Sequence, residues 1–371
     1  MGAPAGTLAS EFSMGTRQGM SLVEMLVGLG IIAIFIALLI PAVQKVRETA
    51  NKMVCGNNLR QVALGLHHYH LDHGKLPPGY LGPIPNEMDV DGNNGPHVGM
   101  LPLIFPYLEQ DNLLKILAID RSNAPVRLPW WDDPVNLDTS FRKLKLLQCP
   151  SVESYDDTQG TAIGVHFYHT PSGPMVSAAV HPPGRTHPLG RTHYVGVAGG
   201  AGRGSDTFWG RYEGILTNRS ETTLGELTAC DGTSNTLLLG EFCGGIDQVQ
   251  ETFAASWVGT GSFGTFQGLP TRDMRPQVNP PPPSVPPTSI FGKCGCGPHG
   301  AVTGRGGLDI SYWFAFSSRH PAGVQFAFAD GSVRLLRRGD TAIWQSEQWY
   351  VLQRLAGKKD AEFADLSLLS D

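Results

Sequence analysis

Residues 25–44 read MLVGLGIIAIFIALLIPAVQ and carry no charged side chain. A helix needs about 20 apolar residues to cross a bilayer, so this run is long enough to span a membrane. The simplest alternative is a cleaved secretory signal, but the apolar core of such a signal is shorter. Glu24 lies at the leading edge of the run, where a carboxylate in lipid is costly unless an opposite charge pairs with it. We therefore predict a permanent single-pass anchor.

The residues around Glu24 resemble a known processing motif. Gly19-Met20-Ser21-Leu22-Val23-Glu24 is similar to the type IV prepilin cleavage and methylation motif. The resemblance implies that a prepilin peptidase cuts between Gly19 and Met20 on the cytoplasmic side and that the new amine of Met20 is methylated. It also implies that Glu24 meets the terminal amine of a neighbouring subunit. Two opposite charges inside lipid stabilise each other, so this pairing supplies the partner that Glu24 lacks.

Residues 1–19 form the leader in this interpretation. Its length is unusual, and it holds one basic residue, Arg17, and the acidic Glu11. Translation from Met14 would leave a short positive leader that fits the positive-inside bias of membrane proteins. Met1 and Met14 both stay open as the true start.

A second helical segment is predicted to follow the transmembrane helix of residues 20–44. Pro41 is expected to bend the helix, which then resumes as an amphipathic spine over residues 45–74. Apolar residues recur there at steps of three and four and predict one buried face, namely Val43, Val46, Ala50, Met53, Val54, Val62, Leu66 and Tyr69. Gly74 and Pro77-Pro78 stop the helix. A continuous helix over residues 22–72 would be roughly 75 Å long.

Residues 75–371 are predicted to form a β-rich domain outside the cytoplasm. The chain has 46 Gly and 28 Pro, which favour many turns over a helix bundle. Short strands, among them residues 237–239, are separated by turn residues, with one modest helix over residues 109–119. Asp330-Gly331 between two apolar stretches predicts a hairpin, because this pair tolerates a tight turn. The expected fold class is α+β, with a pilin-like long N-terminal helix packed on a loop-rich antiparallel sheet.

Several stretches of this domain resemble a large family of bacterial prepilin-like proteins. That family carries a C-terminal histidine, any nine residues and then Asp-Gly, which His320 and Asp330-Gly331 match. Further matching stretches are Cys55-Gly56-Asn57-Asn58-Leu59-Arg60-Gln61, Leu76-Pro77-Pro78-Gly79, Pro106-Tyr107-Leu108-Glu109-Gln110, Cys149-Pro150-Ser151 and Asp231-Gly232-Thr233-Ser234-Asn235-Thr236. The family has no established biochemical role and has also been catalogued as solute-binding-like, so the resemblance implies export and anchoring more firmly than a ligand.

The six cysteines favour disulfides, because an even number fits an exported chain in an oxidising compartment. Cys55 with Cys149 is the best candidate pair, since it would tie the helix to the sheet. Cys230 with Cys243 and Cys294 with Cys296 are weaker candidate pairs. The sequence has no C-x-x-C pair of the usual zinc spacing, so we expect no metal and no other cofactor.

Other clusters have both a structural and a functional reading. Of the four histidines His67, His68, His70 and His73 at the helix end, His67 with His70, or His70 with His73, could share a face and hold a metal, although packing at the helix end is the commoner use. Asp231 with Asn235 could hold calcium, although the EF-hand ligand series is absent. The seven tryptophans could stack on sugars, although core packing is the usual role.

Composition and motifs together predict a structural or assembly protein rather than an enzyme. The formal net charge is -5, and no basic stripe suggests nucleic acid as a partner. No nucleophile, base and metal set is apparent. The expected protein is a pilin-like or pseudopilin-like subunit of a type IV pilus or type II secretion-like apparatus in the bacterial cytoplasmic membrane. Its expected partners are a prepilin peptidase, membrane lipid and neighbouring subunits through residues 20–40. The alternative is an envelope-anchored solute- or carbohydrate-binding module that uses the prepilin motif only for export.

Overall fold

The computed structural model describes residues 21–82, 95–119, 129–152, 161–170, 173–181, 189–203, 208–243, 254–269, 315–360, 362 and 364–370. The chain divides into two compact units, Met1–Thr49 and Ala50–Asp371. The leader of residues 1–19 lies outside the described residues, and the division into a transmembrane helix, a spine helix and a domain outside the cytoplasm stays a prediction.

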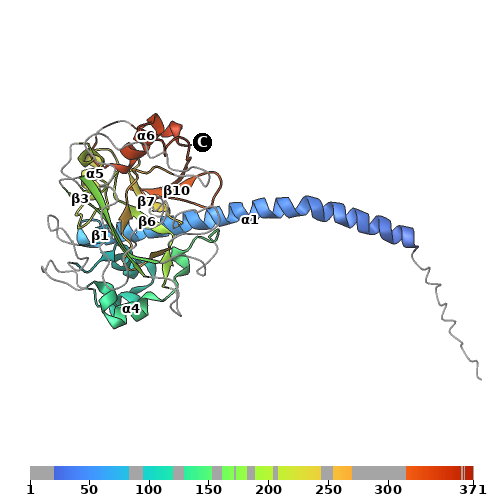
Figure 1. Cartoon of the computed structure of the whole chain (residues 1–371), viewed down its shortest axis with the longest axis horizontal. Helices are drawn as coiled ribbons and strands as arrows, with labels where there is room; N and C mark the ends of the chain where they lie inside the picture. The colour runs from blue at the N-terminus through green and yellow to red at the C-terminus, as the bar shows by residue number, and fades with distance from the viewer. Residues whose placement is uncertain are drawn as a thin grey trace, which may run out of the picture. The chain divides into compact units, whose positions relative to one another are not determined.

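A single long helix, α1, covers Leu22–His73 and continues through Pro41 (Figure 1). Its end follows the sequence signals closely. The backbone N–H of Gly74 donates to the carbonyl of His70 at 2.8 Å, and Gly74 has a φ of 71°. A residue without Cβ adopts this left-handed conformation at little cost, which is why helices often end at glycine. The predicted helix is thus confirmed to within one residue at its end.

The first part of α1 exposes its apolar side chains. Every large hydrophobic residue from Leu22 to Ile40 is at least 50% exposed. Among the described residues, α1 is the one helix long and apolar enough to cross a membrane. A contiguous apolar surface of this size needs a cover of lipid or protein, because water does not tolerate it on a stable monomer.

The last part of α1 is amphipathic, but its buried face differs from the predicted one. Five residues of the buried face are Cys55, Leu59, Val62, Ala63 and Leu66. The prediction was right for Val62 and Leu66 and wrong for Val43, Val46, Met53 and Val54, which are 47–70% exposed. Val62 comes eight residues after Val54, which is two full turns plus about 80° on a helix of 3.6 residues per turn. Val62 and the apolar residues after it therefore point in a different direction from the apolar residues up to Val54. The two groups therefore lie on different faces.

The second unit contains two larger antiparallel-rich sheets. One has the order β11-β10-β7-β6-β9, formed by Val333–Leu336, Val324–Phe328, Leu237–Glu241, Tyr194–Val197 and Ser262–Phe263. The other has the order β4-β3-β8-β5, formed by Gly173–His181, Thr161–Thr170, Ala254–Ser256 and Arg191–Thr192. The β6–β9 and β3–β8 pairs are parallel, and the remaining pairs in both sheets are antiparallel. A short antiparallel pair joins β1, Tyr80–Leu81, to β2, Val98–Gly99. The predicted α+β class is confirmed.

Short helices fill the connections. They are α2 Leu101–Ile104, α3 Asp111–Ile116, α4 Pro134–Ser140, α5 Leu224–Ala229 and α6 Glu347–Ala356, with 3-10 turns at Phe105–Leu108, Trp130–Asp132, Lys145–Leu147, Gly210–Tyr212 and Leu366–Leu368. The helix expected over residues 109–119 is therefore shorter than predicted. The expected strand of residues 237–239 is β7, and the expected hairpin is β10–β11 with Gly331 at a φ of 81°.

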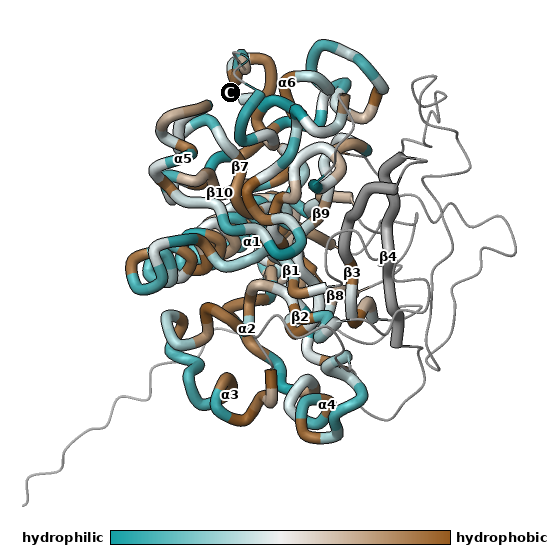
Figure 2. Tube along the Cα trace, turned by 90° about the vertical axis from the view of Figure 1, so that its left-hand side faces the viewer, coloured by the Kyte–Doolittle hydropathy of each residue, from teal (hydrophilic) through white to brown (hydrophobic). Residues whose placement is uncertain are grey.

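Two hydrophobic clusters hold these elements together. The first joins the buried face of α1 to α2 and to β7, whose hydrophobic segments are brown in Figure 2. The second joins the other face of β7 and β10 to α6. A fully buried side chain of leucine or valine contributes about 1.5–3 kcal/mol, so α1 is a structural part of the domain.

Candidate functional site

The processing motif is described only in part, because Gly19 and Met20 lie outside the described residues. Ser21 and Glu24 form a reciprocal capping box at the start of α1. The Ser21 N–H donates to Glu24 Oε2 at 2.8 Å, and the Glu24 N–H donates to Ser21 Oγ at 3.3 Å. These bonds satisfy two backbone N–H groups that a helix start leaves open. Neither bond brings a positive charge to the carboxylate of Glu24.

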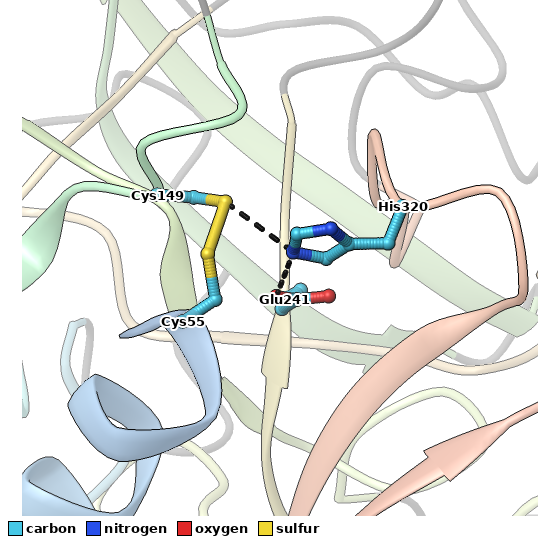
Figure 3. Close-up of side chains that lie close together, drawn as sticks. All are labelled: Cys55, Cys149, Glu241 and His320. Carbon is cyan, nitrogen blue, oxygen red and sulfur yellow. Dashed lines mark hydrogen bonds and ion pairs between the residues drawn. A yellow bond between two sulfur atoms is a disulfide. The ribbon is translucent and has the colours of Figure 1, made fainter. Parts of the chain in front are cut away.

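A second cluster lies in the domain, where Cys55 and Cys149 form the predicted disulfide (Figure 3). The imidazole ring and the carboxylate next to it belong to His320 and Glu241, which are far from both cysteines in the sequence. Figure 3 shows His320 and Glu241 beside the two sulfur atoms. Cys55 and Cys149 are 0% and 3% exposed, and Glu241 and His320 are each 1% exposed. The potential ligand atoms of these four residues all lie within 4.8 Å of one another.

Each of the four residues belongs to a different element. Cys55 is on α1, and Cys149 follows the turn of Lys145–Leu147. Glu241 is the last residue of β7, and His320 precedes β10. The cluster is therefore where the helix, a loop and the central strands of the five-stranded sheet meet.

Hydrogen bonds fix the backbone around Cys149. Asn58 Nδ2 on α1 donates to the Gln148 carbonyl and to Tyr194 Oη, each at 3.2 Å. The Cys149 N–H donates to His193 Nδ1 at 2.9 Å. Burial lowers the pKa of His193 to about 3, and the charges of Arg191 and Arg319 act in the same direction. The ring is thus neutral, which leaves Nδ1 able to accept this bond.

Glu241 uses its two oxygens differently. Oε2 accepts a hydrogen bond from the Gln325 N–H at 3.0 Å. Oε1 accepts no hydrogen bond from any described residue and lies 3.5 Å from His320 Nε2, close enough for an ion pair. His320 Nε2 is also 3.7 Å from Cys149 Sγ. One carboxylate oxygen and one ring nitrogen therefore point toward the sulfur atoms.

Arg338, two residues after the end of β11, supports this region. Its Nη2 donates to the carbonyls of Ser318 at 2.7 Å and His320 at 3.1 Å. Burial lowers the pKa of Arg338, and the charge of Glu241 opposes that shift. Guanidinium stays protonated in proteins, so a positive charge faces the cluster.

The Asp330-Gly331 part of the signature is a hairpin turn. Asp330 Oδ1 accepts the Ser332 N–H at 2.8 Å. A Cβ at Gly331 would lie 3.8 Å from His67 Nε2, so the turn rests against α1. On the same helix, a Cβ at Gly56 would lie 3.1 Å from Gln325 Nε2 of β10. The hairpin that carries the signature therefore contacts α1 at two places, near Gly56 and near His67.

Asp231-Gly232 is also a turn, between α5 and β7. Gly232 has a φ of 83°, and its carbonyl accepts from Thr236 Oγ1 at 3.0 Å. Asn235 Nδ2 donates to the Asp231 carbonyl at 3.4 Å, while Asp231 Oδ2 accepts the Asp360 N–H at 3.2 Å. These bonds stabilise the turn and favour the structural reading of the pair.

The predicted bond between Cys230 and Cys243 is wrong. Cys230 is exposed at the end of α5, whereas Cys243 is buried beside Cys55 and Cys149. The two thiols are thus in different environments. Cys294, Cys296 and the proline run of residues 280–287 lie outside the described residues.

The helix-end histidines make separate packing contacts. His70 Nε2 accepts the Leu224 N–H at 3.2 Å, and the His73 ring stacks on Tyr69 at 3.9 Å between centroids. His67 faces the hairpin turn. The structural reading of these residues is the one their contacts favour.

Glu241, His193 and Arg338 were not singled out from the sequence. Glu241 had one usable signal, because a carboxylate that directly follows a buried apolar strand needs a partner. His193 and Arg338 sit in stretches that read as ordinary loop and strand ends. Their roles depend on contacts between residues far apart in the chain.

The sequence profile of one protein family matches residues 44–338, which include all four residues of the cluster. Neither a curated protein nor a solved structure matches the chain. The matched segment covers most of the chain, begins at the last residue of the apolar run and ends beyond the His320 and Asp330-Gly331 signature. The chain therefore belongs to the family described as "Protein of unknown function (DUF1559)".

Proposed function

We propose that the chain is a type IV pilin-like or pseudopilin-like structural or assembly subunit of the bacterial cell envelope. A prepilin peptidase cuts it between Gly19 and Met20, and α1 holds it in the cytoplasmic membrane. The domain from Ala50 onward then lies outside the cytoplasm. The partners in this proposal are the peptidase, membrane lipid and neighbouring copies of the helix, and no catalytic role is assigned.

One observation carries the proposal, namely an exposed apolar helix surface with a lone carboxylate at its start. Residues 22–40 extend about 28 Å along the helix, close to the roughly 30 Å of a bilayer core. A carboxylate within such a span costs about 3 kcal/mol. The capping box of Ser21 and Glu24 supplies hydrogen bonds but no positive charge.

The amine of Met20 in a neighbouring subunit would supply that charge. Cleavage after Gly19 creates this amine four residues before Glu24, near the same membrane depth. A pair of opposite charges in a medium of low dielectric is strongly attractive, so the pairing favours side-by-side helices over single ones. Processing is thereby linked to assembly.

N-terminal mass spectrometry of the protein from cells with a prepilin peptidase tests the first step. We expect a chain that begins at methylated Met20, and we expect Gly19→Ala to leave the leader attached. A wild-type chain with an intact leader, or one cut elsewhere, would rule the proposal out.

Variants of two glutamates on α1 test the second step. Glu24→Gln should be cut normally but fail to enter filaments or large detergent-resistant assemblies, measured by sedimentation of sheared and solubilised fractions. Glu48→Gln, on the same helix beyond the apolar run, is the matched control and should assemble normally. Normal cutting with single subunits for all three chains would favour an envelope-anchored binding module instead.

A further inference from the structure

The groups around the Cys55–Cys149 disulfide are more polar than a disulfide needs. A disulfide is neutral and packs well among apolar side chains, yet Glu241 and His320 are buried directly beside it. Burying a carboxylate without full hydrogen bonding is unfavourable. Oε1 of Glu241 nevertheless accepts no hydrogen bond within the described part of the chain.

These four side chains have the chemistry of a zinc site. Zn²⁺ prefers four ligands in a tetrahedron and binds thiolate sulfur, imidazole nitrogen and carboxylate oxygen. Metal–ligand bonds of about 2.0–2.3 Å place neighbouring ligand atoms about 3.3–3.8 Å apart. The potential ligand atoms of the cluster already lie within 4.8 Å of one another, and two of the distances are 3.5 and 3.7 Å.

We propose that Cys55, Cys149, Glu241 and His320 bind one Zn²⁺ whenever the two cysteines are thiols. The structure shows the oxidised state of this site, in which the sulfur atoms bond to each other. Only the two sulfur atoms need to separate on going to the zinc state. The other two ligand atoms are already directed at them.

The surrounding residues orient the ligands. The Gln325 N–H holds Oε2 of Glu241, and Oε1 lies 3.5 Å from His320 Nε2. His193 holds the backbone of Cys149, and Arg338 holds the backbone of His320. Two thiolates and a carboxylate exceed the charge of Zn²⁺ by one negative charge, which the buried Arg338 guanidinium offsets. Such outer contacts are typical of metal sites in proteins.

The two states exchange through ordinary thiol chemistry. A dithiol reductant gives two electrons and two protons to the disulfide, which yields two thiols and the oxidised disulfide of the reductant. Zn²⁺ then binds as both thiols release their protons to solvent. In the opposite direction, a disulfide oxidant takes two electrons from the thiolates, its own S–S bond breaks, and two protons from solvent convert it to two thiols. The Cys55–Cys149 bond forms, and Zn²⁺ leaves.

The experiment measures zinc on the full-length chain in detergent micelles. A background with Cys230, Cys294 and Cys296 changed to serine leaves Cys243 as the one thiol besides Cys55 and Cys149, and the same measurement on Cys243→Ala tests its part. The protein is reduced with a phosphine under anaerobic conditions, given zinc sulfate, passed through gel filtration and analysed for metal. We expect one zinc per reduced chain and none per oxidised chain. Co²⁺ in place of zinc should show thiolate charge-transfer bands and the visible bands of tetrahedral cobalt.

Two variants and two matched controls test the ligand assignment. Glu241→Gln and His320→Ala should weaken zinc binding at least about 100-fold, more than the loss of an outer contact usually does. Glu213→Gln and His73→Ala change the same residue types outside the cluster and should have no effect. Circular dichroism of each oxidised variant shows whether it folds, because the disulfide does not depend on either ligand.

Specific outcomes would overturn the proposal. They are a reduced chain that takes up no zinc, zinc binding that survives Glu241→Gln, and zinc binding lost in Cys243→Ala instead. If the reduced chain unfolds, the proposal requires added zinc to restore the circular dichroism spectrum, and failure to do so would also refute it. The measurement uses the purified chain, so its result is independent of processing and assembly.

Discussion

Removal of the Cys55–Cys149 bond should cost the domain a large share of its stability. The two residues are 94 positions apart in sequence. In the chain-entropy treatment, a crosslink that closes a loop of this length stabilises the fold by about 4.7 kcal/mol. Measured losses for native disulfides are about 2–5 kcal/mol. We therefore expect the variant with both Cys55→Ala and Cys149→Ala to lose about 4 kcal/mol of unfolding free energy.

The change to alanine is chosen for the surroundings of the bond. Both sulfur atoms are buried beside Glu241 and His320, so serine would add two more buried polar groups. Urea titration in detergent micelles, with a chelator to exclude metal, gives the unfolding free energy. The emission of buried tryptophans such as Trp209 and Trp257 reports the transition.

The control is Cys230→Ala, which removes an exposed thiol and should change stability by less than about 0.5 kcal/mol. Chemical reduction of the wild type under the same conditions should match the double variant. A double variant within 1 kcal/mol of the oxidised wild type, with the parent bond demonstrated by mass spectrometry of unreduced peptides, would refute the reasoning.

Two further predictions use the same titration. Burial raises the pKa of Asp360 to about 7, with the charge of Asp231 acting in the same direction. The folded chain then binds this proton more tightly than the unfolded chain, so stability falls as pH rises from about 4 to about 7. After allowance for partial exposure, Asp360→Asn should be more stable than wild type by about 1–2 kcal/mol at pH 8. At about pH 4 the two proteins should have the same unfolding free energy. A stability difference that is the same at both pH values would contradict this. Leu59→Ala should cost about 3 kcal/mol and Val46→Ala less than about 0.5 kcal/mol, and the reverse order would contradict the observed buried face of α1.

Local signals in the sequence were enough for much of the fold. The helix end at Gly74 and the hairpin turn at Gly331 depend on backbone conformations that glycine favours, and both were predicted. The uncharged apolar run that ends at residue 44 predicted a membrane-spanning helix, and this run is the exposed part of α1. The buried face of α1 was partly missed, because apolar residues of the exposed part extend past the run to Val54.

The candidate site was only half visible in the sequence. The sequence predicted the bond between Cys55 and Cys149, and the resemblance singled out His320 without placing it beside that bond. Glu241 was not recognised, because the sequence does not show that the end of β7 lies beside the loop that carries His320. Metal spacing rules did not apply, because the four ligands come from four separate elements rather than from one short motif.

The spacing in the His320 and Asp330-Gly331 signature follows from the geometry of α1. His320 reaches the helix at the Cys55–Cys149 bond, and Gly331 reaches it at His67. Twelve residues of helix extend about 18 Å. The five residues of β10 between these contacts extend about 16 Å, and Gln325 at the start of that strand faces Gly56.

A strand of this length therefore spans the same distance as the helix segment beside it. One residue more or fewer within β10 would invert the alternation of the strand, so that Phe326 and Phe328 would not both remain in the core. Packing of the hairpin on α1 thus gives Asp330-Gly331 a structural role. The packing of the hairpin does not explain why a histidine stands at position 320, beside Cys149 and Glu241. His320→Ala is therefore one of the two ligand variants in the zinc experiment.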